Sequence, residues 1–198
     1  MIVTLSGVTG IGKSFFKDLL VNELGFKNMV INTTRPKRDT ETNGIDKVFL
    51  NEEKFQEEKK KGKFGFDFEF LGYRYAYTVQ DLLSDENLVT EVHYSTIFDF
   101  KKNAKNVFSV YMIPNDLNRA KLELKKRHLP SQVEINRLQE IDEHVKEFSQ
   151  NKELQNQFDY IFLNNYDEES KEKLLYIIKE KIELIGESNG VVRCCWWK

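Results

Sequence analysis

Cysteine is scarce in this chain of 198 residues, and its two cysteines are adjacent. Cys194 and Cys195 stand near the end of the sequence, where neighbouring thiols cannot build a disulfide framework or a C-x-x-C metal pair. Histidine is scarce as well, and His93, His128 and His144 show no metal-ligand spacing. From spacing alone we expect each histidine to be an ordinary buried or surface imidazole, and we expect neither a disulfide-held fold nor a structural metal site.

The sequence has no surplus of either charge and no long apolar run. Its 30 Lys and Arg residues stand against 32 Asp and Glu residues, a formal net charge of −2 at pH 7. Because that balance leaves no excess to neutralise a polyphosphate backbone, we expect no nucleic-acid partner. The sequence lacks the run of about 18 apolar residues that a membrane span needs, and its short apolar start has no basic segment before it. We expect no membrane span, no signal peptide and a cytoplasmic location.

What the chain does contain is an alternation of strand-like and helix-like apolar segments. Residues 2–6 are short, β-branched and followed by glycine, whereas apolar residues in 15–24 recur at helical spacing and stop at Gly25. We predict strands at 2–6, 28–32, 87–93, 107–113 and 158–163, and helices at 15–24, 96–102, 116–127, 132–150 and 168–185. This alternation favours an α/β fold, in which helices cover both faces of a parallel sheet.

Residues 33–85 break the alternation and predict an inserted lobe. The segment has a turn-rich start, a charged stretch and an aromatic run at 64–77. We expect most of these rings to form a small core for the lobe, with Tyr75 foremost in facing a ligand. The tail at 187–198 carries no period, and disorder, an exchanged contact and an expression remnant all stay open for it.

The stretch GVTGIGKS, residues 7–14, fits the phosphate-loop pattern G-x-x-x-x-G-K-[ST] between a predicted strand and a predicted helix. Glycines let successive N–H groups turn inward, and the helix N-terminus adds positive potential where phosphate oxygens gather. We expect Lys13 to bridge the outer phosphates of a nucleoside triphosphate and Ser14 to ligate Mg²⁺. The predicted ATP-binding residues are Gly7, Val8, Thr9, Gly10, Ile11, Gly12, Lys13 and Ser14. The alternative is a glycine-rich turn with an exposed lysine.

A second segment, TTRPKRDTETNGIDKVF, begins at Thr33 and is rich in turn residues and arginine. Arg35 and Arg38 lie three residues apart, so their guanidinium groups can grip one phosphate. The carboxylate of Glu41 is then left for a base, a ribose or an arginine. The alternative is a solvated loop that binds nothing.

Together the two segments resemble the guanylate kinase family, whose hallmark T-T-R-x-x-R-x-x-E-x-x-G-x-D-Y-x-F follows an N-terminal phosphate loop. The residues that match in register are Thr33, Thr34, Arg35, Arg38, Glu41, Gly44, Asp46 and Phe49. Downstream, GYRYAYT resembles the family's G-x-x-Y-G-S/T segment, TEVH its D-x-D strand end, RLQE its lid arginine–leucine pair and FDYIFLN its F-D-Y-x-x-x-N strand. The resemblance spans residues 1–186.

The resemblance implies a P-loop kinase fold and the reaction ATP + GMP to ADP + GDP, with Mg²⁺ as cofactor and small nucleotides as partners. It implies one domain, 1–186, with a core at 1–32, 86–114 and 151–186, an acceptor-binding lobe at 33–85 and a helical lid at 115–150. The implied catalytic residues are Lys13, Arg38, Arg127 and Arg137. The implied acceptor-binding residues are Thr34, Arg35, Arg38, Glu41, Lys47, Tyr75, Tyr77, Glu91 and His93. Asn164 is expected near the donor's adenine or as the cap of the following turn.

The chain departs from the family where the family recognises its nucleobase. Lys47 replaces a tyrosine that binds phosphate, Phe66 and His93 replace acids, and Ala76-Tyr77 replaces glycine-serine. Asp67 or Glu69 can supply the missing acid after a shift of one or two residues, and in the lid Glu123 replaces one arginine. Two alternatives therefore stay open. One is a kinase for another nucleoside monophosphate or a phosphorylated sugar; the other is a non-catalytic binding module, a type of relative that typically loses the phosphate loop.

Overall fold

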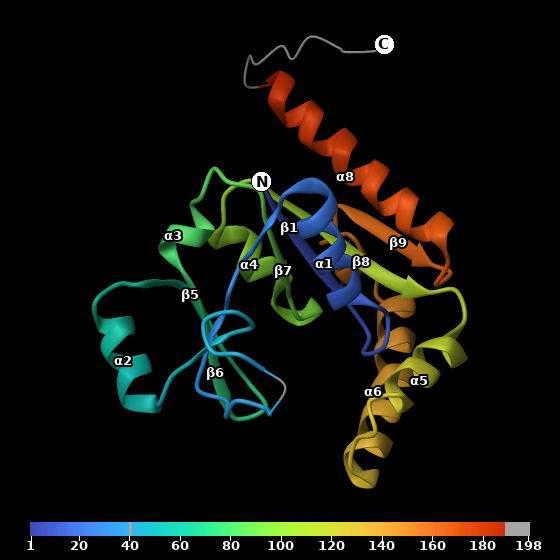
Figure 1. Ribbon diagram of the computed structural model, residues 1–198, viewed down its shortest axis with the longest axis horizontal. Coiled ribbons are helices and arrows are strands. Elements are labelled where there is room, and N and C mark those ends of the chain that lie inside the picture. Colours follow the sequence, from blue (N-terminus) through green and yellow to red (C-terminus); the bar gives the residue numbers. More distant parts are fainter. Residues whose placement is uncertain (40, 189–198) are drawn as a thin grey trace.

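A computed structural model describes residues 1–39 and 41–188 of the chain (Figure 1). The described part contains two sheets, a larger one with strand order β2-β7-β1-β8-β9 and a smaller one with order β4-β3-β6-β5. The tail at 187–198 lies outside the described residues, apart from Glu187 and Ser188 at the end of the last helix. Within the described residues, no helix is both long and apolar enough to cross a membrane.

The larger sheet is parallel throughout, and with helices on both faces it confirms the predicted α/β fold. Its strands are β1 Ile2–Gly7, β2 Lys27–Asn28, β7 Leu88–Glu91, β8 Val107–Pro114 and β9 Tyr160–Asn164. The central strand β1 is an apolar run buried almost from end to end, as a parallel strand between two helical layers requires. Leu5 pairs with Glu91 on one side and Val110 on the other, so these strands bring their carboxyl ends to one edge.

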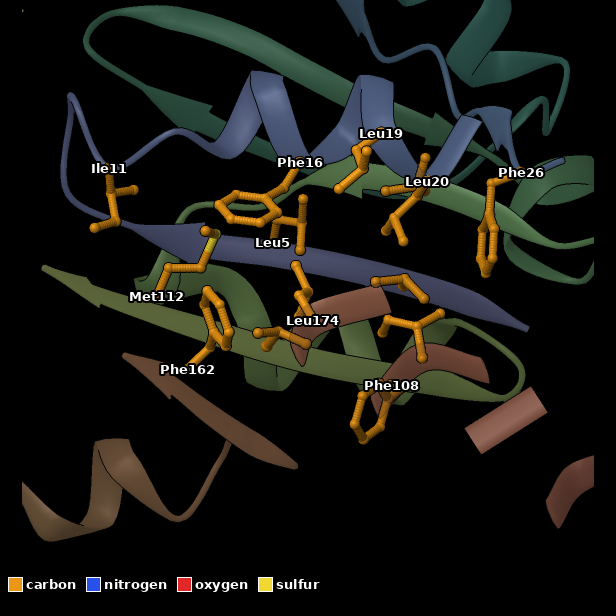
Figure 2. Packing of buried hydrophobic residues seen from close by; sticks show 14 of the residues in the cluster. Leu5, Ile11, Phe16, Leu19, Leu20, Phe26, Phe108, Met112, Phe162 and Leu174 are labelled. Carbon is orange, nitrogen blue, oxygen red and sulfur yellow. The ribbon is translucent and has the colours of Figure 1, made fainter. Parts of the chain in front are cut away.

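Helices α1 and α8 cover one face of this sheet. The helices outside the segment that joins β2 to β7 are α1 Lys13–Leu24, α4 Ile97–Asn103, α5 Leu117–Lys125, α6 Ser131–Gln150, α7 Lys152–Gln155 and α8 Glu168–Ser188. Phe16 and Leu20 of α1 pack with Leu174 of α8 against Leu5 and Phe162 of the sheet (Figure 2). Phe16, Leu19 and Leu20 of the apolar stripe predicted at 15–24 are therefore the buried side of α1, whereas Phe15 is 56% exposed.

The opposite face carries a second buried cluster. Ile2 and Tyr111 of the sheet pack there with Phe100 of α4 and Phe148 of α6. The Tyr111 and Phe148 rings lie parallel, with centroids 3.5 Å apart. This contact anchors the end of α6 to the sheet, while the start of α6 extends beyond the carboxyl edge (Figure 1).

Residues between β2 and β7 build the smaller sheet. Its elements are β3 Asn32–Thr33, β4 Val48–Phe49, α2 Glu52–Lys60, β5 Phe64–Phe70, β6 Tyr73–Thr78 and α3 Val79–Leu82. Strands β5 and β6 form a hairpin whose turn residues, Leu71 and Gly72, have φ angles of +52° and +74°. Positive φ at both positions matches the twist that a tight hairpin needs.

The strand predicted at 28–32 is split between the two sheets, so that prediction is wrong. Strand β2 pairs with β7 in the larger sheet, whereas β3 pairs with β4 and β6 in the smaller one. Met29 and Ile31, between the two strands, are buried in the second cluster. These apolar residues mark a buried crossing from one sheet to the other, and a local pattern cannot distinguish that crossing from a strand.

The aromatic run does not form a separate core for the lobe, contrary to prediction. Phe64 does pack inside the lobe, with its ring 4.8 Å from that of Phe55 in α2. Phe66 and Phe68 instead pack against the second buried cluster, on the larger sheet. The ring centroids of Phe66 and of Phe100 in α4 are 6.2 Å apart. The period of two along β5 turns these rings toward α4, so the run attaches the lobe to the larger sheet.

Candidate active site

Glycines set the shape of the loop between β1 and α1. Gly7 has a φ of +139°, and a Cβ there would lie 2.5 Å from the carbonyl oxygen of Met112 in β8. Gly10 has a φ of +83°, and a Cβ there would lie 2.2 Å from the carbonyl oxygen of Ala120 in α5. A real Cβ does not approach backbone so closely, so only glycine fits at either position. The loop is pressed against β8 and α5, and this packing determines its backbone.

Helix α1 begins directly behind this loop. Gly12 precedes the helix with a φ of +93°, and its carbonyl oxygen accepts from the N–H of Phe16 at 3.0 Å. The first N–H groups of an α-helix have no intrahelical acceptor. The N-cap residue here is Gly12, which has no side chain to accept from them. These amides and the helix dipole make the loop a site for an anion.

Lys13, the first residue of α1, folds back over the loop. Its Nζ donates to the carbonyl oxygens of Gly7 at 2.8 Å and Val8 at 2.9 Å. Burial lowers the pKa of Lys13, and the nearby carboxylate of Glu91 partly opposes that shift. A phosphate in the loop would raise the pKa of Lys13 as the Glu91 carboxylate does, and so would favour the charged ammonium form that binds it.

Asn164, at the end of β9, braces the loop. Its Nδ2 donates to the carbonyl oxygen of Ile11 at 2.9 Å, and its Oδ1 accepts from the N–H of Tyr166 at 2.9 Å. The Tyr166 hydroxyl also donates to the carbonyl oxygen of Gly10 at 3.3 Å. Asn164 is only 2% exposed. Both ends of the Asn164 amide are used, one by the loop and the other by the following turn, which favours the turn-capping alternative over the expected contact with adenine. The contact of Tyr166 with the loop was not predicted from the sequence.

Ser14 and Glu91 meet beside the loop. The Ser14 hydroxyl donates to Oε1 of Glu91 at 2.8 Å, and Glu91 ends β7 at the carboxyl edge of the sheet. Hydroxyl and carboxylate oxygens are the hard donors that Mg²⁺ prefers. Within the described residues, no group of three or more His, Cys, Asp or Glu side chains could hold a metal ion. The pair therefore fits an ion that takes its other ligands from phosphates and water.

The loop from Arg35 to Phe49 is held together by its own charges. Nη2 of Arg35 lies 2.6 Å from Oε1 of Glu41, and the backbone N–H of Arg38 donates to Oε2 of Glu41 at 2.9 Å. The guanidinium carbon of Arg35 also lies 5.5 Å from the ring centre of Phe49. Burial alone would raise the pKa of Glu41, but the hydrogen bonds and charges of the two arginines outweigh it and lower the pKa. Of the three partners predicted for Glu41, the structure shows the arginine.

Thr34 is tied into the smaller sheet. Its N–H donates to the carbonyl oxygen of Arg74 at 3.0 Å, and its Oγ1 accepts from the N–H of Arg74 at 3.0 Å. A hydroxyl that accepts one hydrogen bond still has its own proton to donate. Thr34 can therefore donate to an anion beside Arg35.

Lys47, in the acceptor loop, is surrounded by charges from several elements. Burial lowers its pKa; Glu91 and Glu41 oppose that shift, and Arg35 adds to it. The amine of Lys47 is therefore close enough to Glu91 and Arg35 for their charges to act on it. Glu91 also opposes the lowering of the Lys13 pKa, so its carboxylate acts electrostatically on one cation of each loop.

A family profile described as guanylate kinase matches residues 1–181. The chain belongs to the guanylate kinase family. It is 30% identical over 194 residues to a guanylate kinase of Wolbachia pipientis wMel, with 94% of each chain covered. It is 28% identical over 189 residues to a guanylate kinase of Malacoplasma penetrans, with 91% of this chain and 93% of the relative covered. The crystal structure of guanylate kinase from Anaplasma phagocytophilum shares the fold, with a TM-score of 0.65, 18% identity, and 98% and 96% of the chains covered.

The arginines that match the guanylate kinase lid lie just after α5 and on α6. Arg127 follows α5 and is exposed, whereas Arg137 on α6 lies 2.6 Å from Glu140. Both charges help to lower the pKa of Lys13, so both lie within electrostatic reach of the phosphate loop. Glu123, which replaces a family arginine, pairs with the Lys126 amine at 2.7 Å.

Tyr77 does not face an open site, which corrects its assignment as an acceptor contact. The residue is 1% exposed, and its hydroxyl donates to the backbone carbonyl oxygen of Glu91 at 3.2 Å. Tyr77 therefore supports the end of β7. Tyr75 remains half-buried, with its ring 5.3 Å from that of Phe68.

His93 lies two residues beyond Glu91, just before the short 3₁₀ helix η1, Tyr94–Thr96. Its Nδ1 is 2.7 Å from the hydroxyl oxygen of Ser95. Burial lowers its pKa to about 4, with further contributions from the charges of His144 and Lys13. At neutral pH His93 is therefore an uncharged ring, and the charge of Lys13 in the phosphate loop acts on it.

Proposed function

We propose that this chain transfers the terminal phosphoryl group of ATP to GMP, giving ADP and GDP. Membership of the guanylate kinase family and relatives named guanylate kinase support this function. The intact phosphate loop argues against the alternative of a non-catalytic module. The substrates are small nucleotides, which suits the cytoplasmic location expected from the sequence.

The observation that carries the proposal is the position of Glu91. Its side chain accepts a hydrogen bond from Ser14 on the donor side, and its charge acts on both Lys13 and Lys47. The charge of one carboxylate thus reaches a cation of each proposed anion site. A phosphate in the loop 7–14 and a phosphate held by Lys47 and Arg35 would both bind near Glu91, and direct transfer needs the two phosphates next to each other.

The chemistry then requires positioning and charge neutralisation, with no covalent intermediate on the protein. Lys13 and the amides of the loop would hold the donor, while Arg35, Arg38 and Lys47 would hold the phosphate of the acceptor. Ser14 and Glu91 would hold Mg²⁺, which supplies positive charge to the phosphate oxygens when bound. Arg127 and Arg137 would neutralise charge on the group in transit as α5 and α6 close and exclude water.

The test is ADP release from ATP and Mg²⁺ with GMP as acceptor, compared between Arg38→Ala and Lys37→Ala. Both residues are exposed cations of the same loop, but only Arg38 is assigned to the acceptor phosphate. Losing a charge-assisted phosphate contact should raise the KM for GMP about tenfold to a hundredfold in Arg38→Ala. Lys37→Ala should stay close to the unmodified chain.

Thermal stabilisation by ATP separates the two sites. A ligand that binds only the folded chain raises its unfolding temperature, so Lys13→Ala should remove that shift while Arg38→Ala keeps it. An equal loss of the ATP shift in both variants would contradict the assignment of separate donor and acceptor sites. Absence of ADP release with GMP would remove the proposed function.

A further inference from the structure

Tyr77 joins the acceptor lobe to the donor side of the site. It lies on β6 of the smaller sheet, and its hydroxyl donates to the backbone carbonyl oxygen of Glu91 in the larger sheet at 3.2 Å. In the family pattern this position is a serine, so the contact is not part of that pattern. A buried tyrosine hydroxyl that reaches the strand end carrying a site carboxylate is a candidate for holding that carboxylate in place.

The ring of Tyr77 is fixed by packing. It lies 4.9 Å from the Phe100 ring of α4 in an edge-to-face arrangement, and 6.4 Å from the nearly parallel Phe66 ring of β5. Tyr77 is 1% exposed and belongs to the second buried cluster. Because close-packed interiors leave a side chain little freedom to move, these contacts hold the hydroxyl in one place.

The Tyr77 hydroxyl keeps its proton at neutral pH. Burial raises its pKa; a hydrogen bond with the Thr90 side chain opposes that shift, and the charge of Glu91 adds to it. A protonated phenol can donate to a carbonyl oxygen. The effect of Glu91 on this pKa also shows that its carboxylate lies within electrostatic reach of the hydroxyl.

A second buried hydroxyl holds the residue after β7. Ser6, in β1, donates from Oγ to the carbonyl oxygen of Val92 at 2.6 Å. The N–H of Val92 in turn donates to the carbonyl oxygen of Leu5 at 3.1 Å. Strand β1 therefore holds Val92, whereas Tyr77 holds the Glu91 carbonyl group from the lobe. The end of β7 is thus positioned by both sheets.

Strand β6 also borders the strand that leads into the acceptor loop. Ala76 pairs with Asn32 in β3, and the buried Asn32 side chain donates to the carbonyl oxygen of Ala76 at 3.3 Å. Strand β3 runs directly into Thr34 and Arg35, which are assigned to the acceptor phosphate. Tyr77 follows Ala76, so a shift of the acceptor loop that moves β6 would move the hydroxyl as well.

We propose that Tyr77 is a positioning residue whose hydroxyl fixes the end of β7, so that the Glu91 carboxylate stays beside Ser14, where the two residues would hold Mg²⁺. This inference rests on the proposed function and adds a residue to the same site. Tyr77 acts through Glu91 and is assigned no contact with either nucleotide. Removing a group that orients a metal ligand typically lowers metal affinity by about tenfold to a hundredfold.

The test is the affinity of the full chain for ATP, measured by calorimetry with Mg²⁺ and with a chelator in its place. The ratio of the two dissociation constants gives the contribution of the metal. Phenylalanine keeps the packed ring, so Tyr77→Phe tests the hydroxyl alone. This ratio should fall by about tenfold in Tyr77→Phe, while ATP affinity without the metal should stay unchanged. An unchanged ratio would overturn the proposal.

Tyr111→Phe is the matched control. Tyr111 belongs to the same buried cluster, but it lies on β8, two strands from β7, with its ring on Phe148. This variant should keep the metal contribution of the unmodified chain. An equal fall in Tyr111→Phe and Tyr77→Phe would mean that the loss of any hydroxyl from this cluster disturbs the site, and the proposal would fail.

A double variant decides whether Tyr77 acts through Glu91. Glu91→Gln removes the charge assigned to the metal, so adding Tyr77→Phe to it should lower the ratio no further. A further fall of about tenfold would show another route and overturn the proposal. The expected ratios without ADP release would support the positioning role and remove the kinase function. If Mg²⁺ did not change ATP affinity in the unmodified chain, the proposal would fail together with the assignment of Mg²⁺ to Ser14 and Glu91.

Discussion

The two anion-binding loops keep their shapes by different means. In the phosphate loop, Gly7 and Gly10 pack directly against backbone carbonyl oxygens of β8 and α5. The Asn164 side chain, at the end of β9, donates a hydrogen bond to the loop backbone. In the acceptor loop, the Arg35–Glu41 ion pair holds the shape together with local hydrogen bonds, such as that from the N–H of Phe49 to Oδ1 of Asn43 at 2.9 Å. Gly44 of that loop also has a positive φ, +81°, but a Cβ there would meet nothing within 4 Å among the described residues. Packing against distant backbone therefore sets one loop, and an ion pair with local hydrogen bonds sets the other.

This difference predicts how each loop responds to its ligand. The phosphate loop is in place before ATP arrives, so binding energy is not spent on ordering its backbone. In the acceptor loop an incoming phosphate competes with Glu41 for Arg35, because both are anions suited to a guanidinium fork. Changes in packing should damage donor binding, and changes in charge should damage acceptor binding.

The largest expected effect comes from Gly10→Ala. Its Cβ would lie 2.2 Å from the carbonyl oxygen of Ala120, so the loop would have to move away from α5. A displacement of about 1 Å at a phosphate site costs on the order of a hundredfold in function, so stabilisation by ATP should be nearly lost. The measurement is the shift in unfolding temperature on adding ATP.

Gly44→Ala is the matched control, because both glycines have φ near +80° and only Gly10 is crowded. Alanine at this φ should cost about 1 kcal/mol of folding free energy and leave the ATP shift intact. If the two variants lose the ATP shift equally, backbone strain rather than packing controls the phosphate loop, and the comparison between the loops fails.

Asn164→Ala should have the next largest effect. It leaves the carbonyl oxygen of Ile11 and the N–H of Tyr166 without partners, which should lower the free energy of unfolding by about 2 kcal/mol. ATP affinity should fall, while the KM for GMP should change little. Urea unfolding and ATP titration would measure both effects. Asn165→Ala, at the exposed neighbouring position, should be nearly neutral; an equal loss there would show that the brace is unimportant.

The phosphate loop could be predicted from the sequence because its requirements are local. Positive φ at Gly7, Gly10 and Gly12 and the adjacent Lys13 are all encoded within eight residues. The parallel sheet could also be predicted, since near-continuous apolar strands alternate with amphipathic helices. The α/β prediction therefore needed no knowledge of contacts between distant residues.

Features that depend on distant contacts could not be predicted in the same way. Asn164 reaches Ile11, which lies 153 positions away, so the sequence alone left its role open between adenine contact and cap. Tyr77 lies in a family motif, yet the packing of β6 against the larger sheet buries it. Met29 and Ile31 look like part of one strand, but only the relative position of the two sheets makes them a crossing. In each case tertiary packing overrides a local pattern.

Ionisation of Glu41 in the acceptor loop should make the stability of the fold depend on pH. The pKa of Glu41 is lowered in the folded chain from an ordinary value of 4.5, so its ionised form stabilises the fold above that pH. This contribution is lost as pH falls through the lower folded value. Glu41→Gln should therefore cost about 2 kcal/mol at pH 7 and progressively less below pH 4.5. Urea unfolding at several pH values, followed by circular dichroism, would measure it.

Asp39→Asn is the control for that experiment, since Asp39 is an exposed acid of the same loop. It should change stability by less than about 0.5 kcal/mol at any of these pH values. A stability difference between the unmodified chain and Glu41→Gln that stayed constant with pH would mean that the Glu41 carboxylate does not hold the acceptor loop.

The smallest effect is expected on the outer side of the lobe, from Asp67→Asn. The Lys59–Asp67 pair has side chains that are 43% and 28% exposed, and pairs in such settings contribute less than about 1 kcal/mol. Asp67 alternates with Phe66 and Phe68 along β5, so we expect the KM for GMP to stay within about twofold of the unmodified chain. Steady-state kinetics would show this directly. A large rise in the KM for GMP would mean that Asp67 contacts the acceptor, and would contradict the assigned strand face.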